Sequence, residues 1–152
     1  LRQAQKEHAE KNGNPFLTPY RIGFIGLRDV EPSEQATLQK EGIHCAYMHD
    51  VREKGLQRAV VDLLAAVDPQ NNRRIHLSFD VDGIDPEYTP STGTPVPGGL
   101  SLDQAIQAVE MIRQTGRLFS MDIVEINCKL GSEEDQAKTI KSTMSIIKAS
   151  FC

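Results

Sequence analysis

In the segment "HLSFDVDGIDPEYTPSTGTP", residues 76–95, an apolar run over residues 75–81 leads into a group of acids. Asp80, Asp82 and Asp85 follow one another closely, and no Lys or Arg lies among them. Aspartate is a poor strand former and is costly to bury without a partner. Carboxylates at the end of an apolar strand, with no cation nearby in the sequence, therefore need an explanation.

On both sides of this segment, apolar periodicity predicts four strands that alternate with helices. The strands are expected over residues 21–27, 43–49, 74–82 and 117–127, and the helices over 31–42, 53–67, 101–116 and from Ser132 onward. Strands alternating with helices imply βαβ units, a parallel sheet and right-handed crossovers. The pattern therefore predicts an α/β fold without internal repeats.

Composition narrows the class of protein. The 152 residues suffice for one domain, and the net charge of -4 argues against nucleic acid or an anionic membrane as partner. No apolar run is long enough to span a membrane. The three cysteines form no C-x-x-C pair, which favours free thiols in a reducing compartment such as the cytoplasm. The chain starts at Leu1 without Met, and we expect residues 1–13 to form a polar helix in a processed or truncated polypeptide.

The predicted architecture gives the aspartates a place. Ligands of open α/β sheets bind outside the carboxyl ends of the strands. Asp80 and Asp82 are two residues apart, so in an extended strand both side chains leave the same face, whereas Asp85 precedes Pro86 and is expected in a turn. Two convergent carboxylates favour a hard cation such as Mg, Ca or Mn. The alternatives are a solvated pair of acids, or Asp80 capping local backbone amides.

Short D-x-D motifs occur in several protein families. The haloacid-dehalogenase-type phosphatases carry D-x-D-G-T, of which residues 80–83 match four positions, but Ile84 stands in place of the Thr. That motif also usually opens its fold, whereas two strands are expected before it here. Metal-dependent glycosyltransferases use a short D-x-D, and nothing else in this chain supports that interpretation.

A third family matches far more of the chain. The segment SFDVDGIDPEYTPSTGTPVPGG, residues 78–99, closely resembles the signature of the ureohydrolases, the arginase–agmatinase family. SMDIVEIN (120–127) resembles a second family motif, and IGLRDV (25–30) resembles an earlier strand in its arginase form. With DGIDP in the signature, the arginase branch is the nearest. The resemblance runs in matching order from about residue 20 to the end.

The resemblance implies a three-layer α/β fold with a central parallel sheet, in which residues 1–152 are the C-terminal portion of a single domain. It also implies hydrolysis of L-arginine to L-ornithine and urea with two manganese ions (Mn2+). By resemblance, Asp80 bridges both ions, Asp82 binds one, Glu125 accepts hydrogen bonds from the substrate guanidinium, and Thr94 lines the site. An agmatinase-type enzyme acting on another guanidino substrate remains open, and family members suggest a homotrimer.

Some features favour plainer interpretations. Glu125 alone would be a strand-end surface acid, and Arg28 with Asp29 is expected to form a local or interface ion pair. The remaining metal ligands of the family, His and Asp residues in its N-terminal half, have no counterpart before Asp80. We therefore expect the C-terminal half of an arginase. The alternative is a truncated, inactive remnant that acts as a binding partner. Asp103 stands where arginases often carry an Arg that supports trimer contacts.

Overall fold

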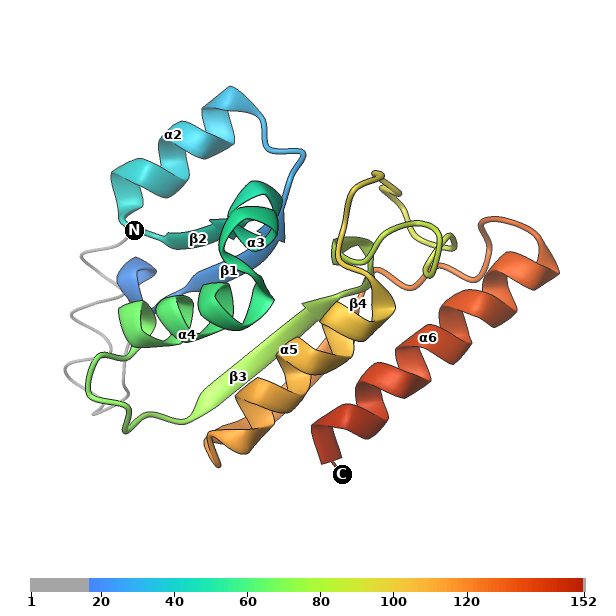
Figure 1. Cartoon of the computed structure of the whole chain (residues 1–152). Helices are drawn as coiled ribbons and strands as arrows, with labels where there is room; N and C mark the ends of the chain where they lie inside the picture. Colours follow the sequence, from blue (N-terminus) through green and yellow to red (C-terminus); the bar gives the residue numbers. More distant parts are fainter. Residues whose placement is uncertain (1–16, 152) are drawn as a thin grey trace, which may run out of the picture.

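The computed structural model describes residues 17–151, so the polar helix expected over residues 1–13 lies outside the described residues. Figure 1 shows strands alternating with helices along the chain. The elements are η1 Pro19–Arg21, β1 Gly23–Leu27, α2 Pro32–Glu41, β2 His44–Tyr47, α3 Met48–Lys54, α4 Leu56–Val67, β3 Ile75–Asp80, η2 Val81–Gly83, α5 Leu102–Gln114, β4 Leu118–Val124 and α6 Glu133–Phe151.

All four strands pair in parallel, which confirms the α/β class. They form two pairs, β1 with β2 and β3 with β4, and the described residues contain no ladder that joins the pairs into one continuous sheet. In the first pair, Gly23 lies opposite His44; in the second, Asp80 lies opposite Val124. Parallel pairing places the carboxyl ends of β3 and β4 side by side.

Several predicted boundaries are wrong: the strands expected to end at residues 82 and 127 end at Asp80 and Val124, and two further errors lie around α3. The strand expected over residues 43–49 ends at Tyr47, because Asp50 Oδ2 accepts a hydrogen bond from the Tyr47 backbone N–H (3.0 Å) and so begins a helix. The helix expected over residues 53–67 is interrupted at Gly55, whose φ of 82° does not continue a right-handed helix. The predicted start of α5 is confirmed, since Ser101 and Gln104 form a reciprocal capping box.

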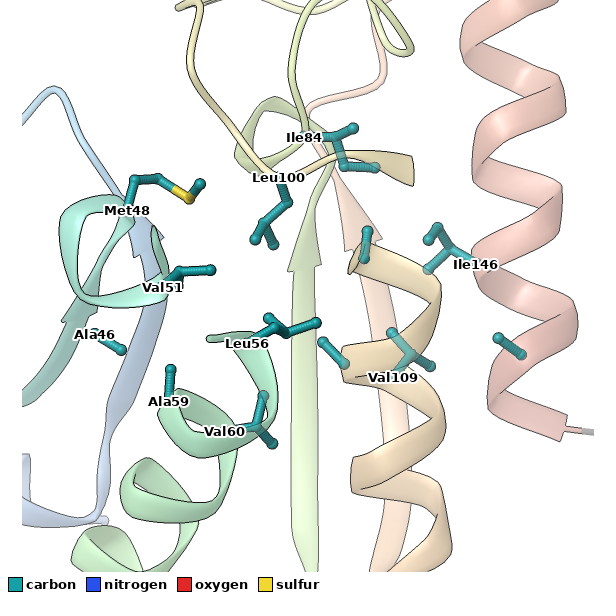
Figure 2. Close-up of a cluster of buried hydrophobic side chains, with 13 residues drawn as sticks. Ala46, Met48, Val51, Leu56, Ala59, Val60, Ile84, Leu100, Val109 and Ile146 are labelled. Carbon is teal, nitrogen blue, oxygen red and sulfur yellow. The ribbon is translucent and has the colours of Figure 1, made fainter. Parts of the chain in front are cut away.

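The core joins both strand pairs. Side chains of α3 and α4 join those of α5, and α5 packs in turn against α6 (Figure 2). Leu100, at the end of the long loop, lies in this cluster, and its side chain is 3.6 Å from the position that a Cβ on Gly26 would take. The buried residues are Ala46, Met48, Val51, Leu56, Ala59, Val60, Ile84, Leu100, Ala105, Ala108, Val109, Ile146 and Ala149.

The β3–β4 pair is covered on one face only within the described chain. Leu77, Phe79, Met121 and Ile123 pack against the core, whereas alternate residues of β3 are exposed. On the open face, His76 Nε2 lies 3.3 Å from Asp122 Oδ2, and both side chains are about half exposed. Within the described residues, β3 is therefore half-buried, with one face open.

At the opposite end of β4 from its carboxyl terminus, the buried carboxylate of Asp68 pairs with the guanidinium of Arg117. Asp68 directly follows α4, and Arg117 directly precedes β4, so this ion pair ties the two strand pairs together. Within residues 17–151, no helix is long and apolar enough to cross a lipid bilayer.

Candidate active site

The two predicted metal ligands lie at the carboxyl end of β3, but not on one strand face. β3 ends at Asp80, and Asp82 belongs to the 3-10 turn η2. The Asp82 backbone N–H donates to Asp80 Oδ1 at 3.0 Å. Asp80 thus caps the turn that carries Asp82, and the prediction that both side chains leave an extended strand is wrong. The turn forms because Asp favours local bonds to the backbone over strand conformation.

The turn still brings the two acids together. The pKa of Asp82 is raised to about 6, first by burial, then by the negative charge of Asp80 and a hydrogen bond to it. The negative charge of Glu125 raises this pKa further, and the positive charge of Arg28 lowers it. The carboxylates of Asp80 and Glu125 therefore both act on Asp82 at this end of the fold.

Glu125 reaches the same place from β4. Val124 is the register partner of Asp80, and Glu125 is the next residue along the chain. Its backbone has a φ of 65°, in the left-handed region that residues with a Cβ avoid. Such a conformation costs roughly 1–2 kcal/mol, so the surrounding structure has to hold it in place.

The loop over residues 83–100 holds Glu125. Thr92 Oγ1 donates to the Glu125 backbone carbonyl at 2.9 Å, and Thr92 pairs with Ile126 in an isolated antiparallel bridge. A Cβ added to Gly93 would lie 3.8 Å from Glu125 Oε2, so Gly93 lies beside the carboxylate. Thr94, the predicted substrate contact, is exposed in this loop and comes directly after Gly93.

Buried hydroxyl residues of the loop were not predicted as part of the site. Thr89, Ser91 and Thr92 are each at most 2% exposed. Thr89 Oγ1 donates to the carbonyl of Val81, between the two aspartates, at 2.9 Å. Ser91 Oγ donates to the carbonyl of Leu130 at 2.8 Å. The segment TPST could have been noted as rich in hydroxyls, but loop sequence carries no periodicity that tells which hydroxyls turn inward.

Arg28 was also assigned incorrectly. It does not form the local ion pair expected with Asp29: its Nη2 donates to the carbonyl oxygens of Asp82 (2.6 Å) and Val96 (2.7 Å), and its Nε donates to Val96 again (3.0 Å). Arg52 Nη2 similarly donates to the carbonyl of Gly98 at 2.8 Å. Two arginines from the β1–β2 half thus hold the loop beside the carboxylates.

Asp85 has the turn role that the sequence predicts. Its Oδ1 accepts from the Glu87 backbone N–H (3.0 Å), and its Oδ2 accepts from that of Gly98 (2.7 Å). These bonds, that of Glu87 foremost, lower the pKa of Asp85 below its usual value. Asp85 thus closes the two ends of the loop onto each other.

The donor set fits a manganese site in part. Asp80 and Asp82 offer hard oxygen ligands of the kind that Mn prefers, and their mutual repulsion favours a bound cation. Residues 17–151 contain no group of three or more His, Cys, Asp or Glu placed to hold one ion. Further ligands would therefore have to come from residues that the structure does not describe or from another chain.

A hollow of about 430 Å3 lies elsewhere, between β1 and α2. Its lining includes Phe24, Leu27 and Leu38 but none of the predicted site residues. Residues 17–151 therefore gather the acids at an open edge of the fold and not inside that hollow.

The fold and the site define an α/β protein with a carboxylate-rich edge at the ends of parallel strands. The chain belongs to the Arginase family, whose model matches residues 7–151. It is 43% identical to an arginase of Schizosaccharomyces pombe over 128 residues, which cover 84% of this chain and 40% of the relative. It is 41% identical to Arginase-1 of Oryctolagus cuniculus over 138 residues, which cover 90% of this chain and 43% of the relative.

Solved structures agree with this assignment. The arginase of Bacillus cereus superimposes with a TM-score of 0.79 and 29% identity, over 91% of this chain and 46% of that protein. The chain thus spans less than half the length of the relatives that it matches. Family membership favours the ureohydrolase interpretation of the D-x-D motif over the phosphatase and glycosyltransferase ones.

Proposed function

We propose that this chain supplies the C-terminal portion of a manganese-dependent arginase that hydrolyses L-arginine to L-ornithine and urea. The observation that carries the proposal is the meeting of Asp80, Asp82 and Glu125 at the carboxyl ends of β3 and β4, with the pKa of Asp82 raised to about 6. Membership of the Arginase family and relatives named arginase support it.

Each acid has a role in this proposal. Asp80 and Asp82 would hold manganese, with Asp80 shared by two ions. A bound metal pair supplies an activated water nucleophile at neutral pH, which an unreactive guanidinium carbon requires. Glu125 accepts hydrogen bonds from the substrate guanidinium, because a carboxylate matches that fork in shape and charge. The exposed hydroxyl of Thr94 lines the same edge.

The proposal extends to partners and place. The ligand is a small guanidino compound, neither nucleic acid nor membrane lipid is a partner, and the protein works in the cytoplasm, with mitochondria as the alternative. One relative, of Mus musculus, is named as mitochondrial. A homotrimer is the expected assembly. Agmatine is the competing substrate, and the competing function is a non-catalytic remnant that binds a full-length ureohydrolase.

The test is a kinetic comparison in the natural full-length polypeptide that contains these residues. We expect Glu125→Gln to lower kcat/KM for L-arginine by roughly tenfold to a hundredfold, since a lost charge-assisted bond costs about 1.5–3 kcal/mol. Bound manganese, measured by elemental analysis, should stay unchanged. Glu133→Gln, at the exposed start of α6, is the control and should match wild type.

Two outcomes would contradict the proposal. Wild-type kinetics of Glu125→Gln would show that Glu125 is a surface acid at a strand end and does not bind the substrate. Absence of urea release by the manganese-loaded natural protein, together with tight association with an active arginase, would favour the remnant. Faster turnover of agmatine than of L-arginine would change the substrate but keep the chemistry.

A further inference from the structure

From the loop contacts we infer that Thr92 is a positioning residue for Glu125, and that its hydroxyl sets where the guanidinium-binding carboxylate lies relative to Asp80 and Asp82. The inference rests on the proposed function, because it assumes that Glu125 binds the substrate. Thr92 is not among the site residues predicted from the sequence, which are Asp80, Asp82, Thr94 and Glu125.

The first step is the strain at Glu125. Among the described residues, only two non-glycine residues have a positive φ: Glu125 at 65° and Asn71 at 52°. Asn adopts this region readily, but Glu does not. A strained residue persists only where its surroundings over-determine it, and such residues cluster at ligand sites.

The second step is what holds the strained peptide. Thr92 Oγ1 donates to the carbonyl oxygen of Glu125 itself at 2.9 Å, and Thr92 is 2% exposed. On the far side, the Asn127 backbone N–H donates to the carbonyl of Ser91 at 3.0 Å. The Glu125 carbonyl thus has a fixed, buried partner, and without it the peptide would be free to rotate toward an ordinary conformation.

The third step is the link to the aspartates. Thr89, three residues before Thr92, donates to the carbonyl of Val81, the residue between Asp80 and Asp82. One short segment therefore binds the backbone of the aspartate turn with one hydroxyl and the backbone of Glu125 with another. Misplacement of a substrate-binding group by about 1 Å can cost on the order of a hundredfold in rate, so the second hydroxyl matters for catalysis.

The experiment compares three variants of the natural full-length polypeptide. Thr92→Val keeps the shape and removes the hydroxyl, and Thr92→Ser restores it. Thr143→Val is the control for stability, because Thr143 is also buried and its hydroxyl donates to the carbonyl of Thr139 within α6 and not to Glu125. L-arginine is the kinetic probe, and a crystal structure of each variant reports the backbone of residue 125.

We expect Thr92→Val to lower kcat/KM about tenfold to a hundredfold, Thr92→Ser to stay within about twofold, and Thr143→Val to lower the melting temperature without a kinetic change. In crystals, Glu125 should move in Thr92→Val alone. An unmoved Glu125, or wild-type kinetics of Thr92→Val beside an impaired Glu125→Gln, overturns the inference and leaves the proposed function standing. Wild-type kinetics of Glu125→Gln overturns both.

Discussion

Arg28 and Asp82 are joined by a 2.6 Å hydrogen bond from the guanidinium Nη2 to the backbone carbonyl, across 54 residues of sequence. The same guanidinium donates twice to Val96, so it connects the end of β1 to the aspartate turn and to the long loop. Lysine cannot reproduce this, because its ammonium is a point charge without a planar fork. Arg28 is therefore a structural connection between the two strand pairs at the candidate site.

Arg28→Met should lower the free energy of unfolding by about 1.5–3 kcal/mol, the range for hydrogen bonds that involve a charged group. Arg58→Met is the control, because Arg58 forms an exposed ion pair with Asp62 along α4. That control should lose no more than about 0.5 kcal/mol. Urea unfolding of both variants measures the difference, and equal losses would show that Arg28 contributes no more than a surface pair.

Gly99 packs against the backbone of the turn after the aspartates. A Cβ there would lie 2.7 Å from Asp85 N and from the carbonyl carbon of Ile84. This is too close for a real contact, and the two backbone atoms cannot easily move aside. We expect Gly99→Ala to destabilise the protein by about 1–3 kcal/mol, as overpacking does. Gly93→Ala is the matched control, since its Cβ would meet only Glu125 Oε2 at 3.8 Å. Thermal melting that ranks Gly93→Ala as the more harmful change would contradict this loop packing.

Asp85 should make stability depend on pH. Its pKa is lowered in the folded protein by the backbone N–H groups of Glu87 and Gly98. A carboxyl with a lowered folded pKa stabilises the fold above its unfolded value, about 3.9, and that stabilisation disappears as the pH falls through the folded value. The melting temperature of wild type should therefore exceed that of Asp85→Asn clearly at pH 7 and much less at pH 3. A constant difference between these pH values would argue against the charge as the cause.

Removal of a proposed metal ligand should affect metal and activity together. We expect Asp80→Asn to weaken manganese affinity by more than about a hundredfold, since loss of an outer-shell partner alone costs about 10–100-fold. Asp122→Asn changes an acid of β4 that pairs with His76, and it should keep its manganese. Titration with manganese followed by elemental analysis measures both. Unaltered affinity in Asp80→Asn would remove Asp80 from the site.

The order of strands and helices was predictable because apolar side chains repeat with the period of each element. The capping box of Ser101 and Gln104 was also predictable, because it depends on a fixed spacing of three residues. The break at Gly55 was not, because residues 52–55 are polar or glycine and carry no apolar period that would mark the end of one helix and the start of another. Local sequence alone does not tell whether a glycine bends a helix or ends it.

The candidate site was likewise predictable in part. The positions of Asp80 and Glu125 at the ends of their strands could be predicted from the resemblance, and the family itself is confirmed. Their roles, and that of Thr94, stay predictions. The contacts of Arg28 and Thr92 could not be foreseen, because each spans more than 30 residues to a backbone carbonyl, and backbone carbonyls have no sequence signature.

The left-handed backbone of Glu125 has a consequence for engineering. At a φ of 65°, Asn or Gly is the residue that relieves strain, whereas the proposed chemistry requires a carboxylate on a longer side chain. Selection for heat tolerance alone would therefore enrich Asn or Gly at position 125 and yield sturdier, inactive proteins. Libraries aimed at a more durable catalyst should keep this codon fixed and seek compensation elsewhere, because stability and activity oppose each other at this residue.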